Sequence, residues 1–212
     1  MKHSKKLILL LFILLLLILP NLKSVSAREG TYKLNGGVGN YGKNNRYYYI
    51  ESSCNNAAGL VSVIQTAWSD WINTTTYTPI SVVKTSNKSA SSFDFSYEAF
   101  PIYTGWYGRT YYYTNPSVDI GLGTDGPSGN YDWTQVSINS STYFTLSISS
   151  ENGLNLRKWL VAHEIGHALG LRHEAVKPDD IRISLMHHTP ELANTDKCDG
   201  ADLEDINKMY AQ

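Results

Sequence analysis

The sequence predicts a single domain of the α+β class, and three observations support this prediction. Segments between residues 79 and 150 alternate apolar and polar side chains with a period of two, as β-strands do. Two longer segments, 55–72 and 154–170, carry apolar residues at helical spacing instead. A third, shorter helix is predicted at 202–210. The chain therefore combines strands with about three helices.

The first 27 residues are typical of a secretory signal peptide. Three lysines precede an unbroken apolar run of thirteen residues at 7–19, and small residues at 25–27 suit a signal peptidase. A membrane anchor is the alternative, but it requires roughly 18 apolar residues, and this run stops at Pro20. We therefore expect a secreted, extracellular protein that has no membrane attachment after cleavage.

The remaining residues are enough for one domain with a sizeable core, and they show no repeat or linker. The formal net charge of −1 becomes more negative once the signal lysines are removed. An acidic exported domain is a poor partner for nucleic acid or an anionic membrane surface. We expect a monomeric domain over residues 46–212, after a flexible Gly- and Asn-rich segment, 28–45, that is also a candidate short prosegment.

The chain has two cysteines, Cys54 and Cys198. An oxidising destination favours a disulfide between them, which would tie the start of the domain to its last helix. The alternative is a pair of free thiols in a host that makes few disulfides.

Regular structure is expected to begin with the Tyr-rich strand RYYYIE. The helix that follows starts at Asn55 or Asn56 and places Leu60, Ile64 and Trp68 on one face, which suits packing on a sheet. The later candidate strands are ISVVKT, SFDFSYEAF, TYYYT, TQVSIN and YFTLSIS, with a turn-rich loop, GLGTDGPSGNYD, among them.

The segment LNLRKWLVAHEIGHALG predicts a buried helix that is capped at Asn152 or Asn155 and ends at Gly170. His163 and His167 are four residues apart, so both imidazoles project from one face of this helix. Gly170 lets the chain turn sharply, and His173 can then return as a third metal ligand.

Three neutral imidazoles leave the fourth position of a tetrahedral zinc ion open, which is typical of a catalytic site. Glu164 is placed to accept a proton from a water in that position and to pass it to a leaving amine. The five fixed positions of H-E-x-x-H-x-x-G-x-x-H would match by chance on the order of once in 100,000 chains of this composition. Core histidines without a metal are the weaker alternative.

The string HEIGHALGLRH, followed by SLMHH, resembles the metzincin zinc endopeptidases, and with DLEDINKMY it resembles the matrixin branch. Met186 matches the methionine that lies beneath the metal in this clan. The resemblance implies a twisted mixed sheet, a long helix packed on it, the zinc helix across its inner face, and a cleft above a C-terminal subdomain.

The sequence departs from the matrixin pattern in several places. Matrixins usually have a proline two residues after the methionine, where this chain has His188. We interpret His187 and His188 as surface residues, although a Tyr at the second position approaches the metal in some relatives. Outside the signal, every histidine lies between His163 and His188, so we do not expect the second, structural zinc of animal matrixins.

Two further features concern calcium and latency. Asp119, Asp125 and Asp132 lie among glycines and are candidate calcium ligands, but solvated turn aspartates are the plainer interpretation. No cysteine precedes residue 54, so the prosegment thiol that blocks zinc in many matrixins is missing. We expect the exported chain to need little or no activation.

The sequence therefore predicts a secreted zinc-dependent endopeptidase that binds protein or peptide substrates in extended form, added to an edge strand. Either TYYYT or the segment near Asp119 could supply that edge. A binding or adhesion protein that keeps zinc only for stability is the alternative from another class. A peptidase confined to small peptides is a narrower one.

Overall fold

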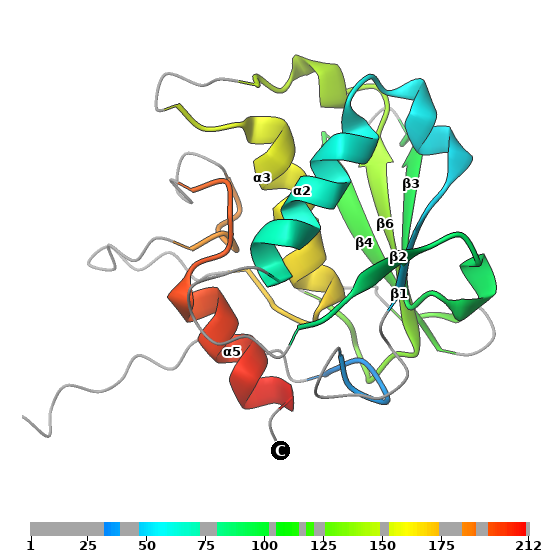
Figure 1. The fold of residues 1–212 in the computed structure, drawn as a ribbon, viewed down its shortest axis with the longest axis vertical. Helices are drawn as coiled ribbons and strands as arrows, with labels where there is room; N and C mark the ends of the chain where they lie inside the picture. The colour runs from blue at the N-terminus through cyan, green and yellow to red at the C-terminus, as the bar shows by residue number, and fades with distance from the viewer. Residues whose placement is uncertain are drawn as a thin grey trace, which may run out of the picture.

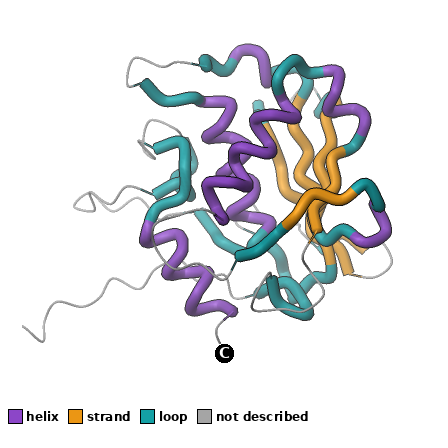
Figure 2. Tube along the Cα trace, in the orientation of Figure 1, coloured by secondary structure: helices purple, strands orange, loops and turns teal. Residues whose placement is uncertain are grey.

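The computed structural model describes residues 32–38, 47–72, 80–101, 105–114, 118–120, 126–148, 153–173, 184–189 and 195–210. The predicted signal peptide, 1–27, lies outside the described residues. Within them a six-stranded sheet carries its long helices on one side (Figure 1). The same arrangement, coloured by secondary structure, separates a helical layer from a strand layer (Figure 2). No described helix is both long and apolar enough to cross a membrane.

The sheet is mixed, as predicted. Its strands are β1 (Tyr47–Ile50), β2 (Val83–Thr85), β3 (Phe93–Glu98), β4 (Gly108–Thr114), β5 (Val118–Asp119) and β6 (Trp133–Asn139), in the order β2-β1-β3-β6-β4-β5. Strands β1, β2, β3 and β6 pair in parallel, whereas β4 runs antiparallel to β6 and β5. The register joins Phe95 to Val136 and Val136 to Thr110. Strand β4 is therefore the last long strand before one edge of the sheet.

Three α-helices complete the described fold: α2 (Leu60–Ile72), α3 (Leu156–Ala168) and α5 (Gly200–Tyr210). Helix α2 packs on the sheet through Trp68, whose ring stacks on Tyr48 at 5.4 Å and meets Phe93 edge-on at 5.2 Å. Trp71 donates a hydrogen bond of 3.1 Å to the carbonyl of Ala162, which joins α2 to α3. Helix α5 lies beyond the C-terminal end of α3 (Figure 1).

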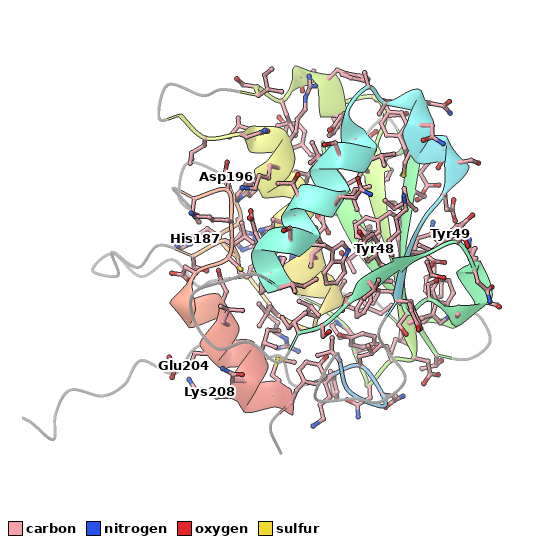
Figure 3. The ribbon with its side chains drawn as sticks, viewed as in Figure 1. Tyr48, Tyr49, His187, Asp196, Glu204 and Lys208 are labelled. Carbon is pink, nitrogen blue, oxygen red and sulfur yellow. The ribbon has the colours of Figure 1, made fainter. Side chains whose placement is uncertain are left out.

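Successive side chains of β1 lie on opposite faces of the sheet. Tyr48 is buried and lies toward α2, while Tyr49 lies on the other side of the strand (Figure 3). The inner side chains of β3, Phe93 and Phe95, are fully buried in the same aromatic cluster. This cluster fixes α2 on the sheet, and α2 in turn supports α3.

Two predicted elements are wrong in detail. The segment YFTLSIS is not a strand, because residues Tyr143–Thr145 form the 3-10 turn η5. There the main-chain N–H and the hydroxyl of Thr145 both donate to the carbonyl of Thr142, a local pattern that competes with strand pairing. The first helix begins later than expected, since residues Ser52–Asn56 form the 3-10 turn η3. Gly59, at a φ of 81°, separates that turn from α2.

The predicted disulfide is also wrong for this structure, in which Cys54 and Cys198 are buried and free. The thiol of Cys54 donates to the carbonyl of Phe95, ahead of α2, whereas that of Cys198 donates to the carbonyl of Asp70, near the end of α2. A helix from Leu60 to Asp70 spans about 15 Å. A disulfide requires Cα atoms within about 7 Å.

Part of the segment expected to be flexible is packed. Leu34 is 1% exposed and Val38 is fully buried. Leu34 also forms a parallel β-bridge with Tyr131, and its main-chain N–H donates to the hydroxyl of Tyr210 on α5. Residues 32–38 therefore belong to the folded domain, because two apolar side chains in this polar stretch are buried against its core.

Candidate active site

The predicted site residues lie on α3 and on the turn after it. The side chain of Asn155 caps α3 by accepting a hydrogen bond from the N–H of Lys158, which is one of the two caps predicted. Every residue from 159 to 168 is buried. The helix therefore reaches the protein interior with its histidines inside, and they need a specific reason to be there.

Gly170 ends the helix for two reasons. Its φ of 99° lies in the left-handed region, which favours glycine. A Cβ atom here would also lie 2.6 Å from Cε of Met209 and 3.1 Å from the carbonyl oxygen of Tyr32. The sharp turn that brings His173 back toward α3 thus depends on this residue.

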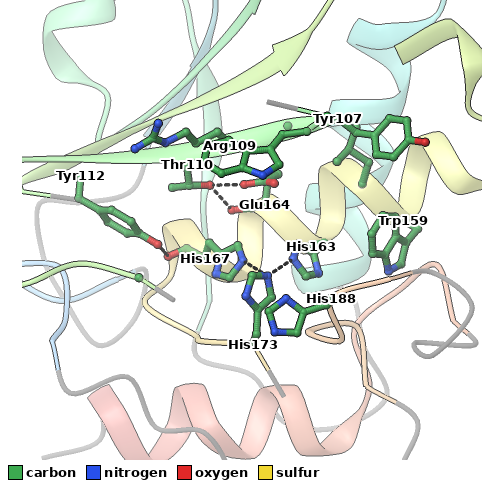
Figure 4. A pocket seen from close by; sticks show the side chains of 15 residues that line it. Tyr107, Arg109, Thr110, Tyr112, Trp159, His163, Glu164, His167, His173 and His188 are labelled. Atoms are coloured by element: carbon green, nitrogen blue, oxygen red, sulfur yellow. Dashed lines mark hydrogen bonds between the residues drawn. The ribbon is translucent and has the colours of Figure 1, made fainter. Parts of the chain in front are cut away.

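The structure brings the three predicted ligands together (Figure 4). The Nε2 atom of His173 lies 3.1 Å from the Nε2 atoms of both His163 and His167. The ligand atoms of the three side chains all lie within 4.8 Å of one another, and this is the cluster in the described part of the chain that could hold a metal ion. One ion can therefore contact all three imidazoles.

Main-chain carbonyls fix the orientation of two of these rings. Nδ1 of His163 donates to the carbonyl of Leu185 at 2.8 Å, and Nδ1 of His167 donates to the carbonyl of Leu171 at 2.9 Å. With the proton on Nδ1, the lone pairs of both Nε2 atoms point into the cluster. Converging lone pairs repel one another unless a cation lies between them, so this donor set fits zinc.

The protonation of His163 supports the same conclusion. Burial holds the pKa of His163 well below its usual range, and the neighbouring His167 and His173 lower it further. A neutral imidazole is the form that binds a metal.

Glu164 lies on the side of α3 that faces β4, and it is 6% exposed. The hydroxyl of Thr110 lies 2.7 Å from Oε2 of this carboxylate. Burial raises the pKa of Glu164 to about 7, although the Thr110 hydrogen bond and the charge of Arg109 lower it. The structure thus places a carboxylate of raised proton affinity beside the histidine cluster.

A pocket of about 410 Å³ lies between β4 and α3. Its lining includes the three histidines, Glu164 and the stretch from residue 105 to 110 (Figure 4). Trp159 and the exposed Trp106 add aromatic surface to it. This volume suits a ligand of a few residues, because binding pockets are commonly about 300–1,000 Å³.

Met186 lies against Gly166 of α3. It is 1% exposed, and a Cβ atom on Gly166 would lie 2.3 Å from its sulfur. Asp202 on α5 fixes this turn by accepting hydrogen bonds from Ser184 Oγ at 2.9 Å and from the N–H of Leu185 at 3.2 Å. Since Leu185 in turn holds His163, the turn connects α5 with the histidine cluster.

The two histidines after Met186 differ from each other. His187 is 6% exposed, so its interpretation as a surface residue is wrong; residues 184–187 are all buried, because this turn packs beneath α3. His188 is exposed as expected, but it also lines the pocket, with its ring centroid 3.8 Å from that of His173.

The structure adds residues that the sequence pattern did not indicate. Thr110 and Tyr112 on β4 bond to Glu164 and to the carbonyl of His167, yet in the sequence they are part of a Tyr- and Thr-rich strand. Trp159 lies on α3, one helical turn before His163. This spacing in the sequence would have been enough to predict that Trp159 lies near the site. Asp202 is part of DLEDINKMY, but nothing local to it reveals a partner eighteen residues earlier.

Calcium remains a prediction. Asp125 and the side chain of Asp119 lie outside the described residues. Oδ1 of Asp132 accepts a hydrogen bond of 2.9 Å from Asn35.

The fold and the site together define a zinc-dependent peptidase of the metzincin class. The defining features are a mixed sheet, a buried helix with two histidines, a third histidine after a glycine turn, and a methionine beneath them. The family model described as Matrixin matches residues 43–211. The chain belongs to the matrixin family and is a zinc metalloendopeptidase.

No curated protein matches the chain. Among solved structures, it is similar to high choriolytic enzyme 1, a hatching enzyme zinc-protease from the medaka fish Oryzias latipes. The identity is 17% and the TM-score 0.45, over 90% of this chain and 99% of that one.

Proposed function

We propose that this protein is a secreted endopeptidase that hydrolyses peptide bonds of extracellular proteins, with Glu164 as general base. One observation carries the proposal: the imidazoles of His163, His167 and His173 converge beside a buried carboxylate in a pocket large enough for a peptide. A site that used zinc only for stability would have no need of that carboxylate.

In this mechanism His163, His167 and His173 would hold the metal. Because the three imidazoles are neutral, they would leave the positive charge of the zinc ion uncompensated. Zinc, when bound, supplies the Lewis acidity that makes water a nucleophile near neutral pH. Glu164 accepts the proton of the attacking water and then donates it to the leaving amine. Its raised pKa suits both transfers, since a group that shuttles a proton works best near the working pH.

The edge of β4 is the proposed binding site for the substrate main chain. Strand β5 pairs with β4 at Tyr113 and Thr114, and the N–H of Ile120, directly after β5, donates to the carbonyl of Tyr112. The pocket lies beside the earlier residues of β4, from Gly108 to Thr110. An extended peptide could add to that stretch by strand pairing, with the scissile bond over the histidine cluster. Of the two edges considered from the sequence, β4 is therefore the one we propose.

Residues 1–27 act as a signal peptide, and residues 46–212, together with the packed segment 32–38, form the catalytic domain. The pattern of lysines, apolar run and small residues supports this assignment.

The test is hydrolysis of a denatured protein by the purified chain starting at Arg28. We expect cleavage that a zinc chelator abolishes and added zinc restores. Glu164→Gln should keep zinc but lose most turnover, because the amide cannot accept the proton. His173→Ala should lose the metal as well. A folded, zinc-loaded wild-type protein that cleaves nothing, or an active Glu164→Gln variant, would contradict the mechanism, and the first outcome would favour a binding protein on a protease scaffold.

A further inference from the structure

Alternate residues of β4 contact the side of α3 that faces the pocket. Gly108, Thr110 and Tyr112 are two apart, so they share one face of the strand. Along that face Gly108 lies against Leu160 and Glu164, Thr110 lies against Glu164, and the hydroxyl of Tyr112 reaches the carbonyl of His167.

The two oxygens of the Glu164 carboxylate have different surroundings. The hydroxyl of Thr110 donates to Oε2 at 2.7 Å, which is the shorter of its two contacts with Glu164; the other, at 3.0 Å, is with the main-chain carbonyl oxygen of the same residue. Oε1 receives no hydrogen bond from a described residue; it lies over Gly108, where an added Cβ atom would come within 3.2 Å of it. One oxygen is thus held and the other is left for a proton.

Gly108 makes this arrangement possible by being small. A Cβ atom at this position would also lie 3.2 Å from Cγ of Glu164 and 3.1 Å from Cδ1 of Leu160. These distances are tighter than ordinary contacts, so a larger residue would push the glutamate side chain toward the cleft or away from it.

We propose that Thr110 is a positioning residue for Glu164, and that Thr110 and Gly108 together form a seat that holds the carboxylate in one rotamer with Oε1 toward the substrate. The inference rests on the proposed function, in which Glu164 transfers protons. A glutamate has several rotatable bonds, and the reaction rate can fall by a large factor when the general base is misplaced by about 1 Å. The seat removes that freedom before substrate binds.

The test compares Thr110→Val, which keeps the shape and removes the hydroxyl, with Thr110→Ser, which keeps the hydroxyl. Thr134→Val is the matched control, because Thr134 is a buried threonine on the adjacent strand β6, and its hydroxyl bonds to the carbonyl of Ser92, away from the pocket. For each variant we would measure kcat and KM on a peptide substrate, the zinc content and the thermal unfolding midpoint.

We expect Thr110→Val to lower kcat about tenfold or more, with KM and zinc content close to those of the wild type. Thr110→Ser should stay within about twofold of wild-type kcat, and Thr134→Val should match the wild type. In the Glu164→Gln background, Thr110→Val should cause no further loss, because the two residues act as a unit. If Thr110→Val does not fold, Thr110→Ala should show the same loss of kcat. Gly108→Ala should also lower kcat, because the added Cβ atom would crowd the side chain of Glu164.

Wild-type kcat in Thr110→Val or Thr110→Ala, with Glu164→Gln inactive, would overturn the positioning role and leave the proposed function standing. Equal losses in Thr110→Val and Thr134→Val would overturn it too, because they would indicate a general effect on the sheet. An active Glu164→Gln enzyme would overturn the proposed function, and this inference with it.

Discussion

The hydroxyl of Tyr112 donates a hydrogen bond of 3.1 Å to the main-chain carbonyl of His167, a zinc-motif residue in the last turn of α3. The next two carbonyls are bonded in the same way, that of Ala168 by Tyr131 at 3.0 Å and that of Leu169 by Tyr210 at 2.9 Å. The last carbonyls of a helix have no partner within the helix. Three tyrosines from separate parts of the chain therefore fix the end of α3, from which the chain turns toward His173.

Tyr210→Phe tests the value of these bonds for stability. The Tyr210 hydroxyl donates to Leu169 and accepts from the N–H of Leu34, so its removal leaves two buried main-chain groups unsatisfied. We expect the free energy of unfolding to fall by about 1–3 kcal/mol. Tyr49→Phe, on β1, should cost much less, because that side chain is only partly buried. Chemical denaturation of both variants would decide, and equal losses would contradict the capping role.

Asp202 should control zinc affinity without touching the metal. Its carboxylate holds Ser184 and Leu185, and the carbonyl of Leu185 holds His163. Asp202→Ala removes those bonds, so we expect zinc affinity to fall about tenfold or more, as is usual when support of a ligand is lost. Asp202→Asn should bind zinc nearly as well as the wild type, because its amide can donate to Ser184 while its oxygen accepts from Leu185. Competition with a chelator of known affinity measures both, and unchanged affinity in Asp202→Ala would contradict this connection.

The same residue predicts a pH dependence of stability. Burial, and after it the charge of Asp199, raise the pKa of Asp202 to about 7, against the hydrogen bonds that lower it. An unfolded aspartate has a pKa of about 3.9. Between these values the folded protein binds more protons than the unfolded chain, so this group's contribution to the free energy of unfolding falls as pH rises from about 4 to 7.

Comparison with Asp202→Asn isolates that contribution, because the histidines titrate alike in both proteins. Denaturation in the presence of a chelator should show the wild type losing stability relative to Asp202→Asn as pH rises through this window. A difference that is constant across the window, or that changes in the opposite direction, would contradict the assignment.

The sequence predicted the parts of this protein whose signals are local. Spacing alone placed His163 and His167 on one face, Gly170 marked the end of their helix, and Asn155 was one of two residues predicted to begin it. Alternation found most strands, although local hydrogen bonds of Thr142 and Thr145 turned one candidate strand into a 3-10 turn. These features depend on residues within a few positions of each other.

What the sequence could not predict depends on contacts between distant segments. The bond from Thr110 to Glu164 joins residues 54 positions apart, and the N–H of Leu34 meets Tyr210 across 176 positions. No periodicity encodes such pairs. The disulfide prediction failed for the same reason, since only the course of α2 shows that Cys54 and Cys198 lie near its opposite ends.

We expect the buried N-terminal segment, residues 32–38, to support the fold and not to inhibit the enzyme. Residues 32–38 lie against α5 and the turn at Gly170. Besides the burial of Leu34 and Val38, the ammonium of Lys33 donates to the carbonyl of Met209 at 3.0 Å. A chain that starts at residue 39 should lose about 3–6 kcal/mol of stability through the two apolar side chains alone.

A chain that starts at Tyr32 is the matched control, because it keeps all of these contacts. It should keep the stability and activity of the chain that starts at Arg28. An inhibitory prosegment would give the opposite result, since its removal would raise activity. Thermal unfolding and peptide hydrolysis on the three chains distinguish the two roles. A chain starting at residue 39 that is both stable and more active would show that residues 32–38 restrain the enzyme and do not support its fold.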